Sequence, residues 1–561
     1  MKIEALVFIR DKEDLKTSLN EIENVHKVIF VCLTFEAFLE AKKINLKYTY
    51  AYKLKNINKI NYIKVGRKSA KKFLKNLNID IIDEDNHYLT SRFVIFFSQL
   101  CFDKSLIFNS IKHYKPSKIY LFREIKDSVI EKGWSQNRSY YYYNTIIKYF
   151  FPKLKLKYYG LFDYKLGKFS NNKLKKINFN FILINLKNFF KIFYYKNIIL
   201  IEGFKNNKNL KKKFIKNFKN KKYTIIDDFK NSLIIRLKYF FFKTEKPNNY
   251  FKTSYKKLKI YGLDYKNLKI EVDAMLKFIS NYLSFQKFLI SVFKKKNYIF
   301  GIFQEKYETI IALKKAKIKT YQLPHGATIT PELSPMIANY NFFPNSIQKK
   351  YHEESYMIKG KSFLTGVPHI NLIKSENKKN FKNIIIFMKN MGMRRWEYDD
   401  YQKILDIVNS VINYSKKNKH NVIIKFHPSG GKYTYSCIKN YKLFLNNNLT
   451  ITIDTDTDEL LKNNNIFICL QESSIINQII TMKKNVIFPL MHLNRNYKKN
   501  YLFENIKRNL IIPEKIGDIA SKIDLVKKKN IKNLKKNKKL ITDFGEKSMD
   551  NINRLIYSLN L

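Results

Sequence analysis

The stretches Asn421–Gly431, NVIIKFHPSGG, and Ile466–Pro489, IFICLQESSIINQIITMKKNVIFP, decide the fold. They contain three short apolar runs bounded by polar residues, Val422–Phe426, Ile466–Leu470 and Val486–Phe488. Between the last two runs, Ile476–Met482 has the apolar spacing of a helix. Strands that alternate with helices predict a parallel sheet with crossover helices. Ligands of such sheets bind at the carboxyl ends of the strands, so we look for chemistry there.

The same alternation of strands and helices runs through most of the chain. It predicts strands at Lys2–Ile9, Lys27–Leu33, Asn61–Val65, Ser117–Phe122, Tyr298–Phe303, Ile318–Leu323 and Ile384–Met388. We expect an α/β fold of two tandem Rossmann-like domains that face each other across a cleft. The N-terminal, acceptor-side domain would span residues 1–375, with a Lys-, Asn- and aromatic-rich insertion at 152–260. Residues 376–530 would form the C-terminal, donor-binding domain, and 531–561 a helical tail.

The chain is strongly basic. Its 561 residues include 107 Lys+Arg against 46 Asp+Glu, a formal net charge of +61. Such a charge suits a nucleic-acid partner or an anionic membrane surface. A compositional drift toward Lys, Asn, Ile, Tyr and Phe is the favoured explanation for most of the charge, because the lysines are spread over the whole chain and arginine is scarce. We therefore expect no specific nucleic-acid partner, and an anionic inner-membrane surface stays open as a partner.

Four widely separated cysteines argue for a reducing compartment and against a cysteine-based metal site. Cys32 and Cys469 lie inside apolar runs and are expected to be buried. The N-terminal MKIEALVFIR has Glu4 and Arg10 inside any apolar segment, so it is interpreted as a strand and not as a secretion signal. No run of about 18 apolar residues predicts a membrane-spanning helix. These features predict a cytoplasmic protein, with a peripheral position at the inner membrane left open.

His427 follows the strand at Val422–Phe426 and precedes Pro428, Ser429 and two glycines. Proline ends the strand, and the glycines would let the backbone approach an anion closely. A histidine here could donate a hydrogen bond to a phosphate or protonate a leaving group. A capping or core histidine in an ordinary turn explains the residue equally well. Lys425, at the end of the same strand, is a further candidate phosphate ligand.

Glu472, Ser473 and Ser474 lie where a strand passes into a helix. The N–H groups and positive dipole end of a helix N-terminus, together with hydroxyl donors, suit a phosphate. Plain capping of the helix by Ser473 is the simpler alternative, and both roles are compatible.

Two more strand ends carry candidate residues. His325, in the PHG sequence Pro324-His325-Gly326, would face the second sheet and serve as a general base, or it is simply a turn residue. Gly392 and Arg394 follow the strand at Ile384–Met388, where the glycine permits close approach of a ligand and the arginine could pair with phosphate or carboxylate.

The acidic run Asp454–Glu459 could mimic a carboxylate metal site. It lacks the glycine and distal glutamate of a calcium loop, and acidic residues before a helix favour its dipole. We therefore predict no metal site.

Taken in order, PHG, TGVP at Thr365–Pro368, KFHP at Lys425–Pro428 and ESS at Glu472–Ser474 resemble the motifs of a known group. This group is the GT-B-fold transferases of bacterial surface polysaccharide synthesis. It includes capsule-polysaccharide transferases, sialyl- and polysialyltransferases with HP and SS motifs, and CDP-glycerol glycerophosphotransferases. The resemblance covers roughly residues 298–520. The acidic motif that sialyltransferases of this kind use as base is absent from this sequence.

The resemblance implies that His427, Ser473 and Ser474 bind the donor phosphate and that His325 is the candidate base. It also implies a metal-independent glycosyltransferase without a cofactor, whose donor is a CMP-, CDP- or UDP-linked sugar and whose acceptor is a glycan or a lipid-linked glycan. A CDP-polyol phosphotransferase and a nucleotide-sugar 2-epimerase are alternatives on the same fold. A non-enzymatic basic protein that binds nucleic acid or a membrane surface is the alternative of another class.

Overall fold

The strands of this protein are short runs of buried aliphatic and aromatic residues, separated by helices and polar loops. The computed structural model describes residues 3–77, 79, 82–123, 142–160, 197–201, 224–227, 259–294, 297–304, 306–324, 334–368, 381, 383–391, 398–427, 431–439, 441–445, 448–463, 465–471, 473–493, 507–528 and 543–560. Short 3₁₀ turns lie at Val25–Lys27, Ala51–Lys53, Ile57–Lys59, Tyr265–Leu268, Lys442–Phe444 and Lys507–Asn509.

The chain forms two compact units, and each is assembled from separate segments. Unit 1 comprises Met1–Gly66, Ile95–Asp163 and Ile373–Lys538, and unit 2 comprises Arg67–Val94, Tyr164–Leu372 and Lys539–Leu561. Two passages between the units fall within the helices α3 (Tyr62–Leu77) and α4 (Asp83–Tyr114). The boundary expected near residue 375 lies close to the return from unit 2 to unit 1, and the expected span 1–375 contributes to both units.

The first sheet of unit 1 is parallel and has the order β3-β2-β1-β4-β5. Its elements are β1 (Ala5–Ile9), α1 (Lys12–Glu21), β2 (Val28–Cys32), α2 (Phe35–Lys43), β3 (Tyr48–Thr49), β4 (Lys118–Phe122), α6 (Tyr142–Phe150) and β5 (Lys155–Tyr159). All five residues of β1 and of β2 are buried, as expected for strands that are covered on both faces.

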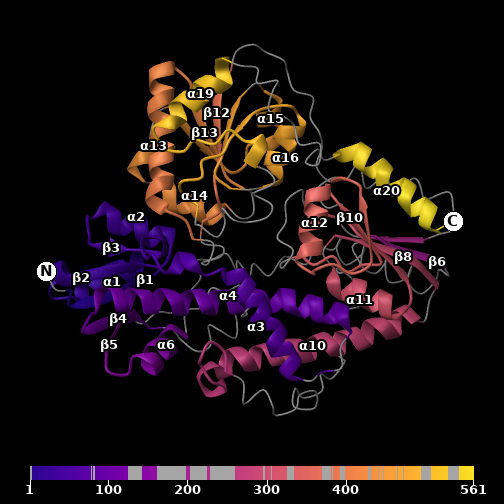
Figure 1. The fold of residues 1–561 in the computed structure, drawn as a ribbon, viewed down its shortest axis with the longest axis horizontal. Helices are drawn as coiled ribbons and strands as arrows, with labels where there is room; N and C mark the ends of the chain where they lie inside the picture. Colours follow the sequence, from indigo (N-terminus) through magenta and orange to yellow (C-terminus); the bar gives the residue numbers. More distant parts are fainter. Residues whose placement is uncertain are drawn as a thin grey trace, which may run out of the picture. The chain divides into compact units, whose positions relative to one another are not determined.

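The second sheet of unit 1 has the equivalent order, β14-β13-β12-β15-β16, and is also parallel. Figure 1 shows its helices around it. Its elements are β12 (Asn383–Phe387), α13 (Tyr401–Asn418), β13 (Asn421–Lys425), α14 (Lys432–Ile438), β14 (Leu449–Thr452), α15 (Thr457–Lys462), β15 (Ile466–Cys469), α16 (Ser474–Thr481), β16 (Val486–Ile487) and α19 (Asp518–Lys528). Both orders match the first five positions of the Rossmann strand order 3-2-1-4-5-6.

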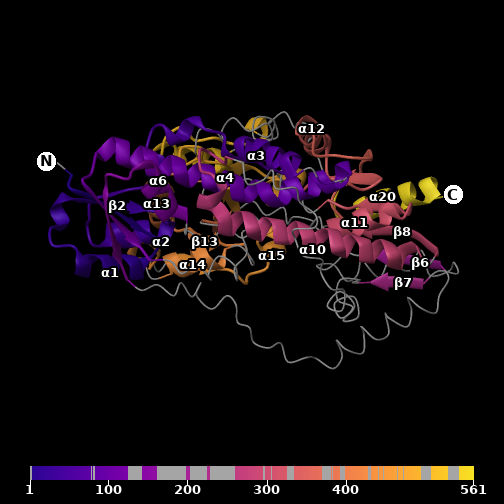
Figure 2. The ribbon, with the colours of Figure 1, turned by 90° about the horizontal axis from the view of Figure 1, so that it is seen from below.

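Unit 2 contains a parallel sheet of its own, with the order β11-β10-β9-β8-β6-β7. Its elements are β6 (Asn197–Ile201), β7 (Thr224–Asp227), α10 (Lys269–Lys294), β8 (Asn297–Phe303), α11 (Tyr307–Lys315), β9 (Lys319–Gln322), β10 (Tyr340–Phe343), α12 (Ser346–Glu354), β11 (Lys361–Leu364) and α20 (Gly545–Asn560). Figure 2 shows β6 and β7 beside β8. Residues 197–201 and 224–227, which fall in the expected insertion, are therefore strands of this sheet.

The C-terminal helix α20 packs on one face of the unit 2 sheet. Its Met549, Ile552 and Ile556 join a buried cluster with alternate residues of the strands, among them Ile199 and Ile302. The chain enters α20 beside Gly366 of the TGVP sequence, which has a φ of +90° and whose Cβ, if present, would lie 2.0 Å from the Asp543 carbonyl oxygen. This glycine therefore serves the close approach of two chain segments within unit 2.

The α/β class and the Rossmann-like domains predicted from the sequence are confirmed, but the described residues form three sheets where two were expected. One expected strand is wrong, because Asn61–Val65 overlaps the start of α3. The buried residues Ala70, Phe73, Leu74 and Leu77 follow the helical period and continue that element as a helix.

One described helix, α4, is long and apolar enough to cross a membrane by length and composition alone. In this structure, 67% of its apolar window is buried within the protein, which is typical of a core helix. Cys32 and Cys469 are buried, as predicted, and burial raises the pKa of both thiols.

Candidate active site

The carboxyl edge of the second unit 1 sheet gathers three strand ends. The chain leaves β12 toward β13 on one side and later returns to place β15 on the other side, so the strand order reverses between β12 and β15. Ligands of open α/β sheets bind at such a switch point. Neighbouring strands lie about 4.8 Å apart, so the ends of β13 and β15 flank β12 at a mutual distance of roughly 10 Å.

His427 lies just beyond the end of β13 with an exposed side chain. The turn that carries it is closed by Gly431, whose N–H donates to the His427 carbonyl oxygen at 2.8 Å. A Cβ on Gly431 would lie 2.6 Å from the Phe426 Cβ and 2.8 Å from that same carbonyl oxygen. Glycine is therefore required here by the turn itself, and not only by the approach of an anion, as the sequence suggested.

Lys425 is the last residue of β13 and is buried. Its Nζ donates to the carbonyl oxygen of Phe426 at 3.1 Å and to that of Ile453. Burial lowers the pKa of Lys425, and the carboxylates of Asp454 and Asp456 oppose this effect. The ammonium group thus ties the end of β13 to the loop after β14, and its predicted contact with a phosphate stays a prediction.

Ser473 and Ser474 lie at the start of α16, both half-buried. Ser473 has the extended backbone of an N-cap residue, with φ −157° and ψ 167°, but its side chain makes no capping hydrogen bond. The plain capping role weighed from the sequence is therefore wrong in this structure. Among the described residues, the Ser473 hydroxyl therefore does not cap α16, while the Ile476 N–H donates to the Ser473 carbonyl oxygen at 3.1 Å.

The end of β12 is fixed on both sides. The Asn390 N–H donates to Gln471 Oε1 at 3.1 Å, and the Met391 N–H donates to Thr434 Oγ1 at 2.8 Å. These two bonds tie the β12 loop to the residue after β15 and to α14. Such an edge is organised before any ligand arrives, which is what electrostatic stabilisation of a developing charge requires.

Four predicted site residues, His325, Glu472, Gly392 and Arg394, lie outside the described residues. In the acidic run, Asp456 accepts from the Asp458 N–H at 3.0 Å and caps α15, in line with the predicted helix-start role. The described part of the chain holds no group of three or more His, Cys, Asp or Glu side chains suited to a metal ion.

Sequence reasoning missed a set of acidic side chains at the carboxyl edge of the first sheet. Asp11 accepts from the Asp14 N–H at 2.9 Å and so caps α1. Glu36 accepts a hydrogen bond from the backbone of Lys12, in the first turn of the same helix. Burial, followed by the charge of Asp11, raises the pKa of Glu36 to about 7. Burial, and then Asp14, raises the pKa of Asp11.

Beside these groups, Arg10 and Asp14 form a fully buried ion pair, with Nε 2.7 Å from Oδ2. The N-terminus of α1 is therefore surrounded by carboxylates of the protein itself. Arg10, Asp11 and Asp14 are neighbours in the sequence, but the fold alone brings Glu36 to them, so the local sequence did not signal the full set.

The two edges of unit 1 are joined by a buried hydrogen bond. Tyr50, just after β3, donates to Asp400 Oδ1 at 2.6 Å. Asp400 caps α13, and its N–H donates to the His492 carbonyl oxygen at 2.8 Å. His492 Nε2 is in turn 2.9 Å from the Leu470 carbonyl oxygen at the end of β15. This chain of contacts ties the first sheet to the strand end that precedes Ser473.

No protein-family model and no curated protein matches this chain. Solved structures similar to it include the UDP-GlcNAc 2-epimerase of Methanocaldococcus jannaschii in complex with UDP-GlcNAc and UDP, at 14% identity and a TM-score of 0.35, covering 64% of this chain and 99% of that chain. The UDP-GlcNAc 2-epimerase of Neisseria meningitidis bound to UDP-GlcNAc has 14% identity and a TM-score of 0.36, and the match covers 64% of this chain and 100% of that chain. MurG of Acinetobacter baumannii has 11% identity and a TM-score of 0.33, and the match covers 65% of this chain and 99% of that chain.

Proposed function

We propose that this protein is an enzyme of the GT-B type that transfers a sugar from a nucleotide-activated donor to a glycan or lipid-linked acceptor in surface polysaccharide synthesis. The donor phosphate would bind at the carboxyl edge of β13, β12 and β15. The observation that carries the proposal is that α16 begins at the strand-order switch point with Ser473 in the N-cap position and without a capping hydrogen bond from the Ser473 side chain. The resemblance of the HP and SS motifs supports the same assignment.

In this proposal an acceptor hydroxyl attacks the anomeric carbon of the donor and gives up its proton to a base, for which His325 is the candidate, while the bond from the anomeric carbon to the phosphate oxygen breaks. Negative charge then grows on the departing phosphate. The N–H groups and hydroxyls at the start of α16 would stabilise that charge from one side, and the exposed His427 from the other. The fixed end of β12 between them would hold the two halves of the site at a constant separation.

A ligand screen tests the proposal first. CMP-, CDP-, UDP- and GDP-linked donors are added to the protein, and thermal stability is measured. A specific donor should raise the melting temperature in a concentration-dependent way, because ligand that binds only the folded state stabilises it. If none of the donors stabilises the protein at millimolar concentration, the proposal fails.

His427→Ala is the sharper test, once a donor is known. We expect kcat to fall by about 10²-fold or more, the usual effect of removing one group that stabilises a developing oxyanion. Stability should change little because the side chain is exposed. His420→Ala is the matched control: His420 precedes the amino end of β13, away from the carboxyl edge. An unchanged kcat in His427→Ala, or an equal loss in His420→Ala, contradicts the assignment.

The products separate transfer from its alternatives. Release of the free nucleotide that depends on an acceptor indicates transfer. Interconversion of the donor at the sugar C2 without an acceptor would instead make the protein a nucleotide-sugar 2-epimerase.

A further inference from the structure

Unit 2 contains a cavity of about 430 Å³ between the second half of α3 and the start of α4. This volume is within the range of small-molecule sites. It is lined by Lys71, Leu74, Lys75, Ile79, Asn86, His87 and Thr90. The lining thus combines cationic groups and polar groups with two aliphatic side chains.

The α3 wall of the cavity is basic. Lys71 and Lys75 lie one helical turn apart and both line it. The helix carries further lysines and Arg67 but no acidic residue. Partial burial, and then the nearby Arg67, lowers the pKa of Lys71. An anion in the cavity would relieve this repulsion between like charges.

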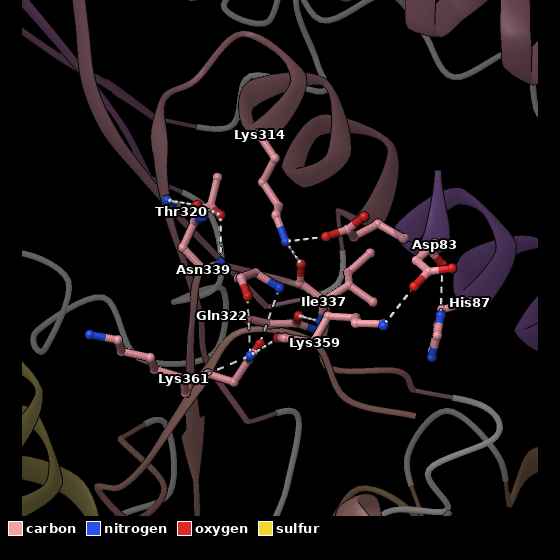
Figure 3. A network of polar contacts seen from close by, with 12 residues as sticks. Asp83, His87, Lys314, Thr320, Gln322, Ile337, Asn339, Lys359 and Lys361 are labelled. Atoms are coloured by element: carbon pink, nitrogen blue, oxygen red, sulfur yellow. Dashed lines mark hydrogen bonds and ion pairs between the residues drawn. The ribbon is translucent and has the colours of Figure 1, made fainter. Parts of the chain in front are cut away.

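The acidic residues nearest in sequence already have cationic partners. Figure 3 shows the start of α4, where Asp83 pairs with Lys359 at 2.8 Å. Glu84 pairs with Lys314 and Asp85 with Lys315, both at 2.7 Å. Among the described residues, no ion pair joins a carboxylate to Lys71 or Lys75. The charges of Lys71 and Lys75 are therefore not neutralised by any carboxylate among the described residues.

The imidazole of His87 also lines the cavity. Its Nδ1 is 2.6 Å from the Asp83 carbonyl oxygen and its Nε2 is 2.8 Å from the Tyr356 carbonyl oxygen. These two contacts join the ring to the start of α4 and to the loop after α12, so His87 holds a fixed place in the cavity wall.

The α4 wall also offers a polar donor, Asn86. The Thr90 hydroxyl donates to Asn86 Oδ1 at 3.5 Å, which directs the Asn86 amide nitrogen to act as a donor elsewhere. Two exposed hydrophobic residues lie close by: Ile82 directly precedes α4 and is 42% exposed, and Tyr356, whose carbonyl oxygen contacts His87, is 75% exposed. An anion with an attached apolar group fits this combination.

We propose that this cavity binds a phosphate ester, with Lys71, Lys75 and Asn86 holding the phosphate and Leu74 and Ile79 contacting its apolar part. The same phosphate chemistry is offered by a phospholipid headgroup and by a soluble phosphorylated compound. The site lies in unit 2, and its occupation requires no nucleotide-activated donor, so it stands apart from the proposed function.

Binding measurements on the full chain test the proposal. Glycerol 3-phosphate is titrated by calorimetry, and vesicles of phosphatidylglycerol or phosphatidylcholine are tested by sedimentation. Lys71→Glu with Lys75→Glu should weaken binding of the phosphate at least roughly tenfold, the scale of one hydrogen bond to a charged group. Lys68→Glu with Lys72→Glu makes the same charge change on α3 outside the cavity and should alter binding by less than about threefold.

The outcomes distinguish a lipid headgroup from a soluble phosphate ester, and they also show when the proposal is wrong. If the wild type binds phosphatidylglycerol vesicles but not glycerol 3-phosphate, and only the Lys71→Glu, Lys75→Glu variant loses vesicle binding, the ligand is a lipid headgroup. If the wild type binds glycerol 3-phosphate and only that variant loses this binding, the ligand is a free phosphate ester. Equal losses in both double variants mean diffuse charge and overturn the proposal, as does wild-type protein that binds neither probe at millimolar concentration. Should the charge reversal unfold the protein, Lys71→Ala with Lys75→Ala provides the same comparison. None of these readouts depends on donor turnover.

Discussion

Replacement of Glu36 by glutamine should make the protein more stable above pH 7. The pKa of Glu36 is raised from 4.5 to about 7, first by burial and then by the charge of Asp11. Below pH 4.5 the carboxyl is protonated in the folded and unfolded states, so it has no effect. Between the two values only the folded state binds the proton, and stability falls as pH rises. Above pH 7 the carboxyl is ionised in the folded and the unfolded states, and the folded state is destabilised by the full free-energy cost of holding the charged Glu36 carboxylate.

The pKa difference corresponds to about 3 kcal/mol at most. Glu36 is only half-buried, so solvent screening reduces this to about 1–2 kcal/mol. Glutamine keeps an oxygen that can accept the hydrogen bond from Lys12 but carries no charge. We therefore expect Glu36→Gln to exceed the wild type by about 1–2 kcal/mol at pH 8, and the gain should vanish toward pH 4.5.

Urea denaturation of both proteins at pH 5, 6, 7 and 8 measures this difference. Glu21→Gln is the control, because it removes one negative charge at the exposed end of α1. A gain for Glu36→Gln that is the same at every pH would refute the electrostatic reasoning. So would the absence of any gain at pH 8, or an equal gain in Glu21→Gln.

Two further substitutions test the packing that holds the proposed site. Tyr50→Phe removes the 2.6 Å hydrogen bond to the buried Asp400 and should cost about 1–3 kcal/mol of unfolding free energy in urea denaturation, whereas a loss below 0.5 kcal/mol would show that the bond contributes little. Gly431→Ala places a Cβ against Phe426 and His427 and should cost about 1–3 kcal/mol and weaken donor binding, while normal stability and affinity would mean that the turn adjusts freely.

Local patterns predicted the strands well because each is an aliphatic run bounded by turn residues, as at β12, β13 and β15. They failed at Asn61–Val65, where a few apolar residues fit a strand as well as the first turn of α3. The number of sheets could not be predicted either. The pairing of β6 with β8 joins runs far apart in the sequence, and no local feature of either run specifies its neighbour.

In the candidate site, too, the local sequence predicted some residues, while other contacts arise only from the fold. His427, Ser473 and Ser474 were predictable because a strand end followed by polar residues is a local feature. The bond between Tyr50 and Asp400 joins residues 350 positions apart, and the raised pKa of Glu36 comes first from its burial and then from the charge of Asp11. Such contacts exist only in the folded chain. The bonds from the Lys425 ammonium group to the carbonyl oxygens of Phe426 and Ile453 were likewise not predictable from its place at a strand end, and its contact with a phosphate stays a prediction.

The helix starts of unit 1 explain why only one of its two similar sheets is proposed to bind the donor. Both sheets have the Rossmann order, so topology alone does not distinguish them. In the first sheet, Asp11 and Glu36 already place carboxylates on the N-terminus of α1, and a phosphate there would meet negative charge. In the second sheet, Ser473 begins α16 without a capping bond, and the nearby His427 can donate a proton. We therefore expect an anion to be repelled at the first edge and attracted at the second, and for this reason we propose the C-terminal sheet as the donor site.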